Sequence, residues 1–479
     1  MSDFTEYENY DALGLARLVR DGDVSAGEVL DAAIARAGAR NPRINALCHD
    51  LHDRARAAIG AGLPDGPFAG VPFLLKDLYA LLEGAPICNG SRMFDGYVCD
   101  HDTELVARHK RAGLVIFGRT ASPEFGLCYT TEPRVHGPTR NPWKLDRIAG
   151  GSSGGAGAAV AARIVPMAHA SDGGGSIRVP ASCCGLFGLK PTRARNPSGP
   201  DAGEGWAGLG VSHAVTLSVR DSAALLDATS GPDAGDPYHA PVPARPFLDE
   251  VGAEPGRLRI AVTTDNPNDA PVHADCRAAL DEAAKLCEEL GHDVSEAAPA
   301  YDKEAMGDAM MAVVGANTLA AVNRRAAELG REATERDVER VTWSVARRGD
   351  TVTGESYVQA TQTLHRVGRQ LASFFTDHDV LLTPTLAQPP IAIGAMDMMT
   401  EDLDSYRDLL SAFAAFPSLA NVTGCPAMSM PLHWNTGGLP IGAMFMAPFG
   451  DEATLLRLAA QLEAARPWFH RRPPLDGMG

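Results

Sequence analysis

The chain has 479 residues, of which 45% are hydrophobic and 22% are charged, proportions that are ordinary for a globular protein with a large buried core. Its formal net charge of −17 at pH 7 argues against nucleic acid or an anionic membrane surface as a partner, because both would repel it. We expect no apolar run to reach the roughly 18 residues of a spanning helix. The first residues lack the basic and apolar regions of a signal peptide, so a cytoplasmic protein is expected.

The segment that begins at Tyr10 predicts two amphipathic helices. Ser25 lies between them and is followed three residues later by Glu28, which is the pattern of a capping box at the start of the second helix. The next motif, "HDLH" from His49, is expected to fall in a helix. Since no cysteine or carboxylate cluster with metal-site spacing surrounds it in the sequence, no metal site is predicted there.

Short apolar runs alternate with helix-like stretches along the rest of the chain. The runs that predict strands are "FAGVPFLLKD", "GLVIFGRT", "RIVPMAHA", "RLRIAVTTD" and "HDVLLTPT". This alternation predicts an α/β fold in which helices cover both faces of a large mixed sheet, in a single domain of residues 1–479. Two irregular segments, at about residues 196–215 and 388–406, are expected to be loops that shape a substrate site.

Two glycine-rich turns, each with a serine, lie close together in the chain. The first, "GGSSGG", places Ser152 and Ser153 where the helix-forming run "GGAGAAVAAR" begins, so helix capping is one interpretation of these serines. The second, "SDGGGS", ends at Ser176, and its glycines let backbone N–H groups turn toward a bound oxyanion. A plain tight turn is the other interpretation.

Lys76 lies upstream, at the end of the apolar run "GVPFLLKD". Burial of an ammonium group is costly unless the group is paired or loses its proton. A desolvated lysine can be neutral near pH 7 and can then act as a base, and a serine–lysine pair is a known form of nucleophile activation. Lys76 is therefore a candidate base for a serine on one of the two turns.

Together, "GVPFLLKD", "GGSSGGAGAAVA", "DGGGSIRVPA" and "GLKPT" resemble the amidase signature family of serine hydrolases, and later motifs up to "GLPIGAMFM" extend the resemblance over most of the chain. The 24-residue step from Ser152 to Ser176 matches the family's pattern. The resemblance implies that Ser176 is the nucleophile, Lys76 the base and Ser152 the hydroxyl that connects them, after a cis peptide between Gly151 and Ser152. It also implies an enzyme that needs no metal or organic cofactor and whose partners are a small-molecule amide and water.

The resemblance implies roles for neighbouring residues as well. An oxyanion hole would be formed by the N–H groups of Gly173, Gly174, Gly175 and Ser176. Asp172 and Arg178 match positions that support this loop, and Ser153 matches one beside the lysine. The family often has threonine at the position of Gly173, which predicts a looser loop, and often has glutamine near Met444, which predicts a less polar pocket.

Within the family, the segments "TTEPRVHGPTRNPW" and "SVRDSAALLDATSGPDAGDPYHAP" are similar to the 6-aminohexanoate-cyclic-dimer hydrolases and to amidases that cleave anilides or carbamates. Pocket residues are expected from the two loops and from the helix-like run "MGDAMMAVVGANTL". The apolar candidates are Trp206, Met396, Met398, Met399 and Met444. Flexible methionines suit a pocket for varied apolar groups, although the same side chains could instead pack the loops down.

Three other functions stay open from the sequence. Within the family, the chain could be the glutamine-hydrolysing subunit of a tRNA-dependent amidotransferase, against which the strong negative charge argues. The "GSSGG" run also fits the G-x-S-x-G elbow of α/β-hydrolases, which would make Ser153 the nucleophile of an esterase. The glycine turns could also form a phosphate cradle in a non-enzymatic protein, but no "GK[ST]" follows either turn.

The nine cysteines are odd in number and scattered, which predicts reduced, mostly buried thiols and no disulfide framework. Cys183 and Cys184 follow the second glycine-rich turn and are expected to pack beneath it.

Overall fold

A mixed sheet of eight strands lies at the centre of the computed structural model, which describes residues 4–475. The strand order is β10-β9-β11-β13-β12-β7-β8-β6. Strands β10, β9 and β11 are parallel to one another, and the other neighbouring pairs are antiparallel. The strands are β6 (Met167–Asp172), β7 (Phe187–Lys190), β8 (Val211–Thr216), β9 (Arg259–Val262), β10 (Asp293–Glu296), β11 (Val380–Pro384), β12 (Ala427–Trp434) and β13 (Pro440–Met446).

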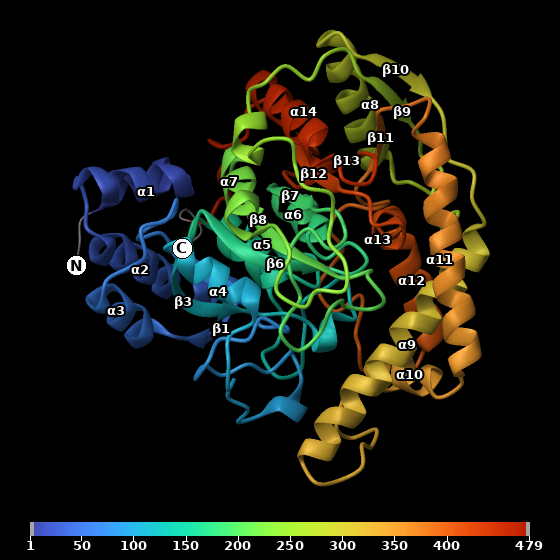
Figure 1. Ribbon diagram of the computed structural model, residues 1–479, viewed down its shortest axis with the longest axis horizontal. Coiled ribbons are helices and arrows are strands. Elements are labelled where there is room, and N and C mark those ends of the chain that lie inside the picture. Colours follow the sequence, from blue (N-terminus) through green and yellow to red (C-terminus); the bar gives the residue numbers. More distant parts are fainter. Residues whose placement is uncertain (1–3, 476–479) are drawn as a thin grey trace.

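The central strands divide the apolar core into two layers. In β11, Val380 and Leu382 belong to one buried cluster and Leu381 to another, and in β13 Phe445 and Met444 are divided in the same way. This division follows because successive side chains of a strand point to opposite faces. The first cluster is completed by α7 (Val219–Thr229), α8 (Ala274–Glu289) and α14 (Glu452–Ala465), and the second by α9 (Lys303–Glu328), α11 (Gly354–Phe374) and α13 (Ser418–Thr423). Helices therefore cover both faces, as the sequence predicted (Figure 1).

A smaller sheet of three strands lies at the β6 edge of the large one. Its order is β1-β3-β2, and β2 lies alongside β6. These strands, α5 and the N-terminal helices share an N-terminal cluster of buried side chains, which includes Leu30, Phe73 and Phe117. The strands are β1 (Leu47–Asp50), β2 (Pro72–Lys76) and β3 (Val115–Thr120), and the pair β4 (Arg140–Asn141) and β5 (Lys144–Ile148) stands apart.

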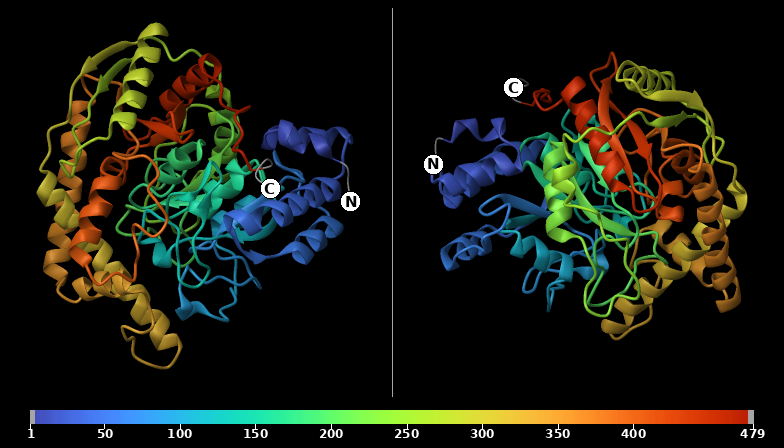
Figure 2. Two further views of the ribbon diagram at one scale, coloured as in Figure 1. Left: turned by 180° about the vertical axis from the view of Figure 1, so that it is seen from behind. Right: turned by 45° about the horizontal axis from the view of Figure 1, so that its top comes forward.

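The remaining helices surround these sheets, and Figure 2 shows α1 to α3 at the opposite end of the molecule from α9 to α11. The predicted capping box is confirmed, because Ser25 and Glu28 each accept the other's backbone N–H at the start of α2. The helices not yet bounded are α1 (Ala12–Asp21), α2 (Ala26–Ile44), α3 (His52–Ala61), α4 (Glu104–Arg111), α5 (Gly154–Ala161), α6 (Arg178–Cys184), α10 (Arg340–Gly349) and α12 (Leu403–Phe413). Short 3₁₀ helices are η1 (Thr5–Asn9), η2 (Arg92–Phe94), η3 (Glu124–Gly126) and η4 (Phe247–Glu250).

The structure corrects three local predictions. The "HDLH" motif is not helical throughout, because His49 lies in β1 and α3 begins only at His52. The loop expected at 196–215 ends where β8 begins at Val211, and the loop expected at 388–406 ends where α12 begins at Leu403. The cysteine prediction is confirmed, since all nine cysteines are free and eight of them are buried.

Helix α9 corrects the expectation about apolar runs. By length and composition it is long and apolar enough to cross a membrane, the one helix of residues 4–475 for which this holds. It packs against α10 and α11, and its residues Met306 and Val313 belong to the second buried cluster. Its apolar side chains are therefore used at least in part for packing inside the protein.

Candidate active site

Strand β2 carries Lys76 into the interior of the protein. All five residues of the strand are buried, and the Lys76 side chain is fully so. Its Nζ donates to Ser152 Oγ at 2.7 Å and to Ser171 Oγ at 2.9 Å. Burial lowers the pKa of Lys76 to about 7, against the opposing effect of the negative charge on Asp172. A large share of this lysine is therefore uncharged at neutral pH and able to accept a proton.

The first glycine-rich turn presents Ser152 to this lysine. The peptide between Gly151 and Ser152 is cis, as the resemblance implied. A Cβ on Gly151 would lie 2.5 Å from the carbonyl oxygen of Thr130, so only glycine fits there. Helix α5 then begins at Gly154. The turn thus brings the Ser152 hydroxyl and the lysine amine into direct contact.

Ser153 precedes α5 but does not cap it, since its side chain accepts no bond from the first turn of the helix. Its Oγ donates to the carbonyl oxygen of Ser171 at 3.2 Å. Ser153 therefore has no direct contact with Lys76 among the described hydrogen bonds; Ser171 lies between them and bonds to both. It is also fully buried, which argues against its role as the exposed nucleophile of an esterase elbow.

The carboxylate of Asp172, at the end of β6, holds the second turn. It accepts the N–H of Gly175 at 2.7 Å and the N–H of Ile177 at 3.0 Å. Gly175 has a φ of +136°, a conformation that strongly favours glycine. Ser176 stands between these two residues and its side chain is largely buried, with 6% exposure. The turn is therefore fixed on both sides of the candidate nucleophile.

The implied oxyanion hole needs one correction. The N–H of Gly175 is not available to an oxyanion because it already donates to Asp172. Between residues 4 and 475, no hydrogen-bond acceptor is found for the N–H groups of Gly173, Gly174 and Ser176. These three N–H groups remain as candidate oxyanion donors.

Asp172 and Arg178 form a fully buried ion pair beneath the turn. The Arg178 guanidinium donates to the carboxylate through Nε at 3.0 Å and through Nη2 at 2.9 Å. Burial alone would raise the pKa of Asp172, but the charge and hydrogen bonds of Arg178 outweigh it and hold this pKa well below its usual range. Asp172 is therefore ionised at neutral pH, and its carboxylate continues to accept the N–H groups of Gly175 and Ile177.

Sequence reasoning missed three contacts that complete this arrangement. Asn421, on α13, donates to Asp172 Oδ1 at 2.9 Å and accepts from Arg178 Nη2 at 2.6 Å. Tyr129 Oη donates to the carbonyl oxygen of Gly174 at 3.0 Å. Ser171 is the second hydroxyl on the lysine amine. Asn421 stands in the motif "NVTGCPAMSMP", but no sequence pattern indicated what it would contact.

Trp206 is the predicted pocket residue that lies at the second turn. A Cβ on Gly173 would be 2.9 Å from the Trp206 ring, so this ring covers Gly173. A Cβ on Gly174 would meet Tyr129 Oη at 3.1 Å and Met310 Cε at 3.2 Å. Met310 belongs to α9, the helix from which pocket residues were expected. Aromatic and apolar groups therefore border two of the candidate N–H donors.

The methionine candidates lie elsewhere. Met396 and Met398 are buried and belong to the N-terminal cluster, which favours the interpretation that they pack their loop down. Met399 Sδ accepts a hydrogen bond from Arg134 at 3.6 Å. Met444 is buried beneath Arg178, whose Nη1 lies 3.3 Å from its Sδ. The apolar composition of this loop did not indicate which of its side chains pack into the core and which face the active site.

The buried Lys76 at the end of β2 contacts Ser152 of the first glycine-rich turn and Ser171 at the start of the second, an arrangement that fits the amidase family. The chain belongs to that family, whose sequence model, described as "Amidase", matches residues 28–456. The protein is an amidase that hydrolyses carbon–nitrogen bonds other than peptide bonds.

The chain is similar over nearly its whole length to hydrolases of one cyclic amide. It is 41% identical over 483 residues to the 6-aminohexanoate-cyclic-dimer hydrolase of Paenarthrobacter ureafaciens, with 97% of this chain and 96% of that protein covered. It is 40% identical over 482 residues, with the same coverage, to the enzyme of that name from Pseudomonas sp. (strain NK87). A solved structure of 6-aminohexanoate cyclic dimer hydrolase matches with a TM-score of 0.92 at 40% identity, and covers 98% of this chain and 99% of that one.

Proposed function

We propose that this amidase cleaves neutral amides with an extended apolar part, cyclic or linear oligomers of an ω-amino acid first among them, through an acyl-enzyme. Ser176 is the nucleophile, Ser152 relays the proton and Lys76 is the base. The contact of 2.7 Å between Lys76 Nζ and Ser152 Oγ, in a buried setting that lowers the lysine pKa to about 7, carries the proposal.

In the first half of the reaction, neutral Lys76 takes the proton of Ser152 while Ser152 takes the proton of Ser176. Ser176 Oγ then attacks the amide carbon, and the negative charge moves to the carbonyl oxygen. The N–H groups of Gly173, Gly174 and Ser176 are suited to stabilise that oxyanion because no acceptor for them is found among residues 4–475.

The second half reverses the proton path. Lys76, now charged, returns a proton through Ser152 to the leaving nitrogen, because an amide nitrogen is expelled easily only as a neutral amine. The carbon–nitrogen bond breaks and the acyl group stays on Ser176. A water molecule then attacks the ester, and its proton passes through Ser152 to Lys76. The bond between the acyl carbon and Ser176 Oγ breaks, the proton returns by the same path to Ser176, and the carboxylic acid is released.

Two observations support an extended neutral substrate. Trp206, Tyr129 and Met310 border the turn that carries the candidate oxyanion donors, and such side chains favour apolar groups. Two relatives with 40% and 41% identity are named as hydrolases of 6-aminohexanoate cyclic dimer. That compound contains neutral amides and apolar methylene chains, and the methylene chains fit the apolar side chains that border the turn.

A hydrolysis panel with the purified protein tests the proposal. It comprises 6-aminohexanoate cyclic dimer, its linear dimer, hexanamide, an anilide, a carbamate and glutamine, with the Ser176→Ala variant as the control. We expect the highest kcat/KM for one of the ω-amino-acid amides and no turnover by the variant. A preference for glutamine would instead favour the amidotransferase function, and full activity of Ser176→Ala would exclude the assigned nucleophile.

A further inference from the structure

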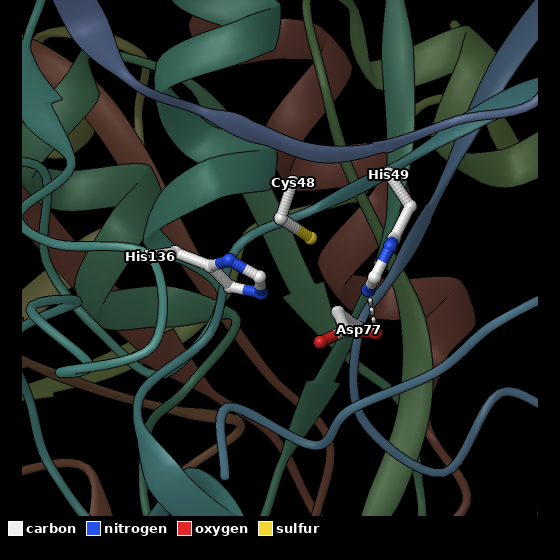
Figure 3. A group of neighbouring side chains, drawn as sticks. All are labelled: Cys48, His49, Asp77 and His136. Carbon is white, nitrogen blue, oxygen red and sulfur yellow. Dashed lines mark ion pairs between the residues drawn. The ribbon is translucent and has the colours of Figure 1, made fainter. Parts of the chain in front are cut away.

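Four side chains outside the active site converge on one point behind strand β2. They are Cys48, His49, Asp77 and His136, and one ligand atom from each lies within 4.8 Å of those of the other three. Figure 3 shows the Cys48 sulfur and the two histidine rings directed toward the Asp77 carboxylate. Residues 48 and 49 come from β1, Asp77 directly follows β2, and His136 comes from the loop before β4.

We propose that Cys48, His49, Asp77 and His136 form a binding site for a divalent transition metal, zinc in the first place, that joins these three segments. Thiolate, imidazole and carboxylate are the donors that zinc takes from proteins, usually four of them in a tetrahedron. A donor set with sulfur and nitrogen disfavours calcium and magnesium, which bind through oxygen.

The spacing of the donors is close to what a tetrahedral ion requires. Zinc–ligand distances of about 2.0–2.3 Å place neighbouring ligand atoms roughly 3.3–3.8 Å apart. His49 Nε2 already lies 3.7 Å from Asp77 Oδ1. Because no pair of the four atoms is more than 4.8 Å apart, contraction by about 1 Å through small side-chain rotations completes the site.

The His49 ring gives the second, independent observation. Its Nε2 is buried but makes no hydrogen bond within residues 4–475, and buried polar atoms without a partner are rare in proteins. The His49 side chain retains 22% exposure, which gives an ion access from solvent.

The charges around the cluster suit a cation. When the Cys48 thiol releases its proton to the solvent on metal binding, it and Asp77 together supply two negative charges. Arg119, a buried cation whose charge acts on Cys48 and His49, is directed to the carbonyl oxygen of Ala80 at 2.8 Å and offsets only one of them.

Cys88 supports Asp77 from the other side. Its backbone N–H donates to Oδ1 at 3.1 Å and its thiol donates to Oδ2 at 2.7 Å. Such outer contacts fix the orientation of a ligating carboxylate and raise metal affinity. Cys88 Sγ is also 3.0 Å from His136 Nε2, so the experiment must distinguish the two thiols.

The test uses the full chain without a purification tag, stripped with a chelator and dialysed against zinc or cobalt(II). We expect one zinc ion per chain and, with cobalt, an absorption band for a sulfur–cobalt bond. Cys48→Ser should remove that band, and His49→Gln should weaken zinc binding by at least about tenfold. The matched controls, Cys287→Ser and His52→Gln, lie outside the cluster and should bind as the wild type does.

Zinc should also raise the unfolding temperature of the wild type, because the ion joins three segments of the folded chain only. Less than stoichiometric zinc in the wild type overturns the proposal, as does a cobalt spectrum without the sulfur band. If the band survives in Cys48→Ser and disappears in Cys88→Ser, the donor set proposed here is wrong. The wild-type measurements decide the matter even if a cluster variant fails to fold.

Discussion

Replacement of Lys76 by methionine is expected to abolish amide hydrolysis without emptying the space that the lysine fills. Methionine keeps most of the apolar length of the side chain but loses the amine that contacts Ser152 and Ser171. Loss of a positioned base costs about 10²–10⁴-fold in rate. The loss in rate is larger where the base acts together with a nucleophile and a relay, because removal of one member inactivates all of them.

The pH dependence follows from the same residue. Only uncharged Lys76 accepts a proton, and its pKa is about 7, so kcat/KM should rise with pH and level off above neutrality. Each pH unit below the midpoint should cost about tenfold, which makes the rate at pH 5 roughly a hundredfold lower than the plateau.

Stability should change in the same direction with pH. The pKa of Lys76 is lower in the folded chain than the ordinary 10.5, so the unfolded chain binds more protons between these two values. The contribution of Lys76 to the free energy of unfolding therefore increases as pH rises from about 7 to about 10, by up to about 1.4 kcal/mol per pH unit. The Lys76→Met variant should lack this increase.

The assay follows aniline release from an anilide between pH 5 and 9 for the wild type and two variants. Lys190→Met is the matched control, because Lys190 is also fully buried with a pKa lowered to about 7 by burial. Within the described part of the chain, however, its Nζ donates to the carbonyl oxygen of Pro191 and to no serine. The control should keep the midpoint near pH 7. A wild-type rate that is flat from pH 5 to 7, or a midpoint that moves only in the Lys190 variant, refutes the assignment of the base.

Four further outcomes are expected. Combining Ser176→Ala with Lys76→Met should cost little more activity than either change alone, and losses that multiply would mean that the two residues act separately. Ser152→Ala should retain more activity than Ser176→Ala, since water can replace a relay hydroxyl but not a nucleophile; equal rates would contradict this order. Asn421→Ala should lower the free energy of unfolding by about 1–3 kcal/mol, because it leaves buried partners of Asp172 and Arg178 unpaired, and denaturant titration measures the loss. Across amides from acetamide to hexanamide, each buried methylene should add up to about 0.8 kcal/mol to transition-state binding; Trp206→Ala should flatten this series, and an unchanged slope would exclude Trp206 from the pocket.

The sequence predicted those features that depend on neighbours in the chain. The apolar run before Lys76, the turn glycines and the capping box at Ser25 are local patterns, and the structure has a strand, two turns and a helix start at those places. The lowered pKa of Lys76 could be foreseen as well, because a lysine at the end of a buried strand has no route to solvent.

The rest depends on contacts between distant segments, which no local pattern encodes. Asn421 reaches Asp172 across 249 positions of the chain, and the use of the Gly175 N–H by that carboxylate depends on a particular turn geometry. The sequence predicts a helix for the "HDLH" motif, whereas His49 lies in β1 and faces Asp77 at the end of β2. Met396 and Met398 are residue types that could line a pocket. Their burial in the N-terminal cluster depends on how their loop packs against distant segments, which the sequence does not show.

Lys76 and Asp77 are consecutive residues at the end of β2, and their side chains contact different groups of residues. The lysine amine contacts the serines of the active site, whereas the aspartate contacts Cys88 and faces His49. Because side chains alternate along an extended backbone, a slip of β2 by a single residue against β3 would place the Asp77 carboxylate beside Ser152, and a slip in the opposite direction would place the Lys76 ammonium among the histidines. The residues that fix this register therefore constrain the chemistry on both sides at once. Insertions or deletions between residues 64 and 71, which would shift β2 against β3, should be far less tolerated than their distance from the reacting groups suggests.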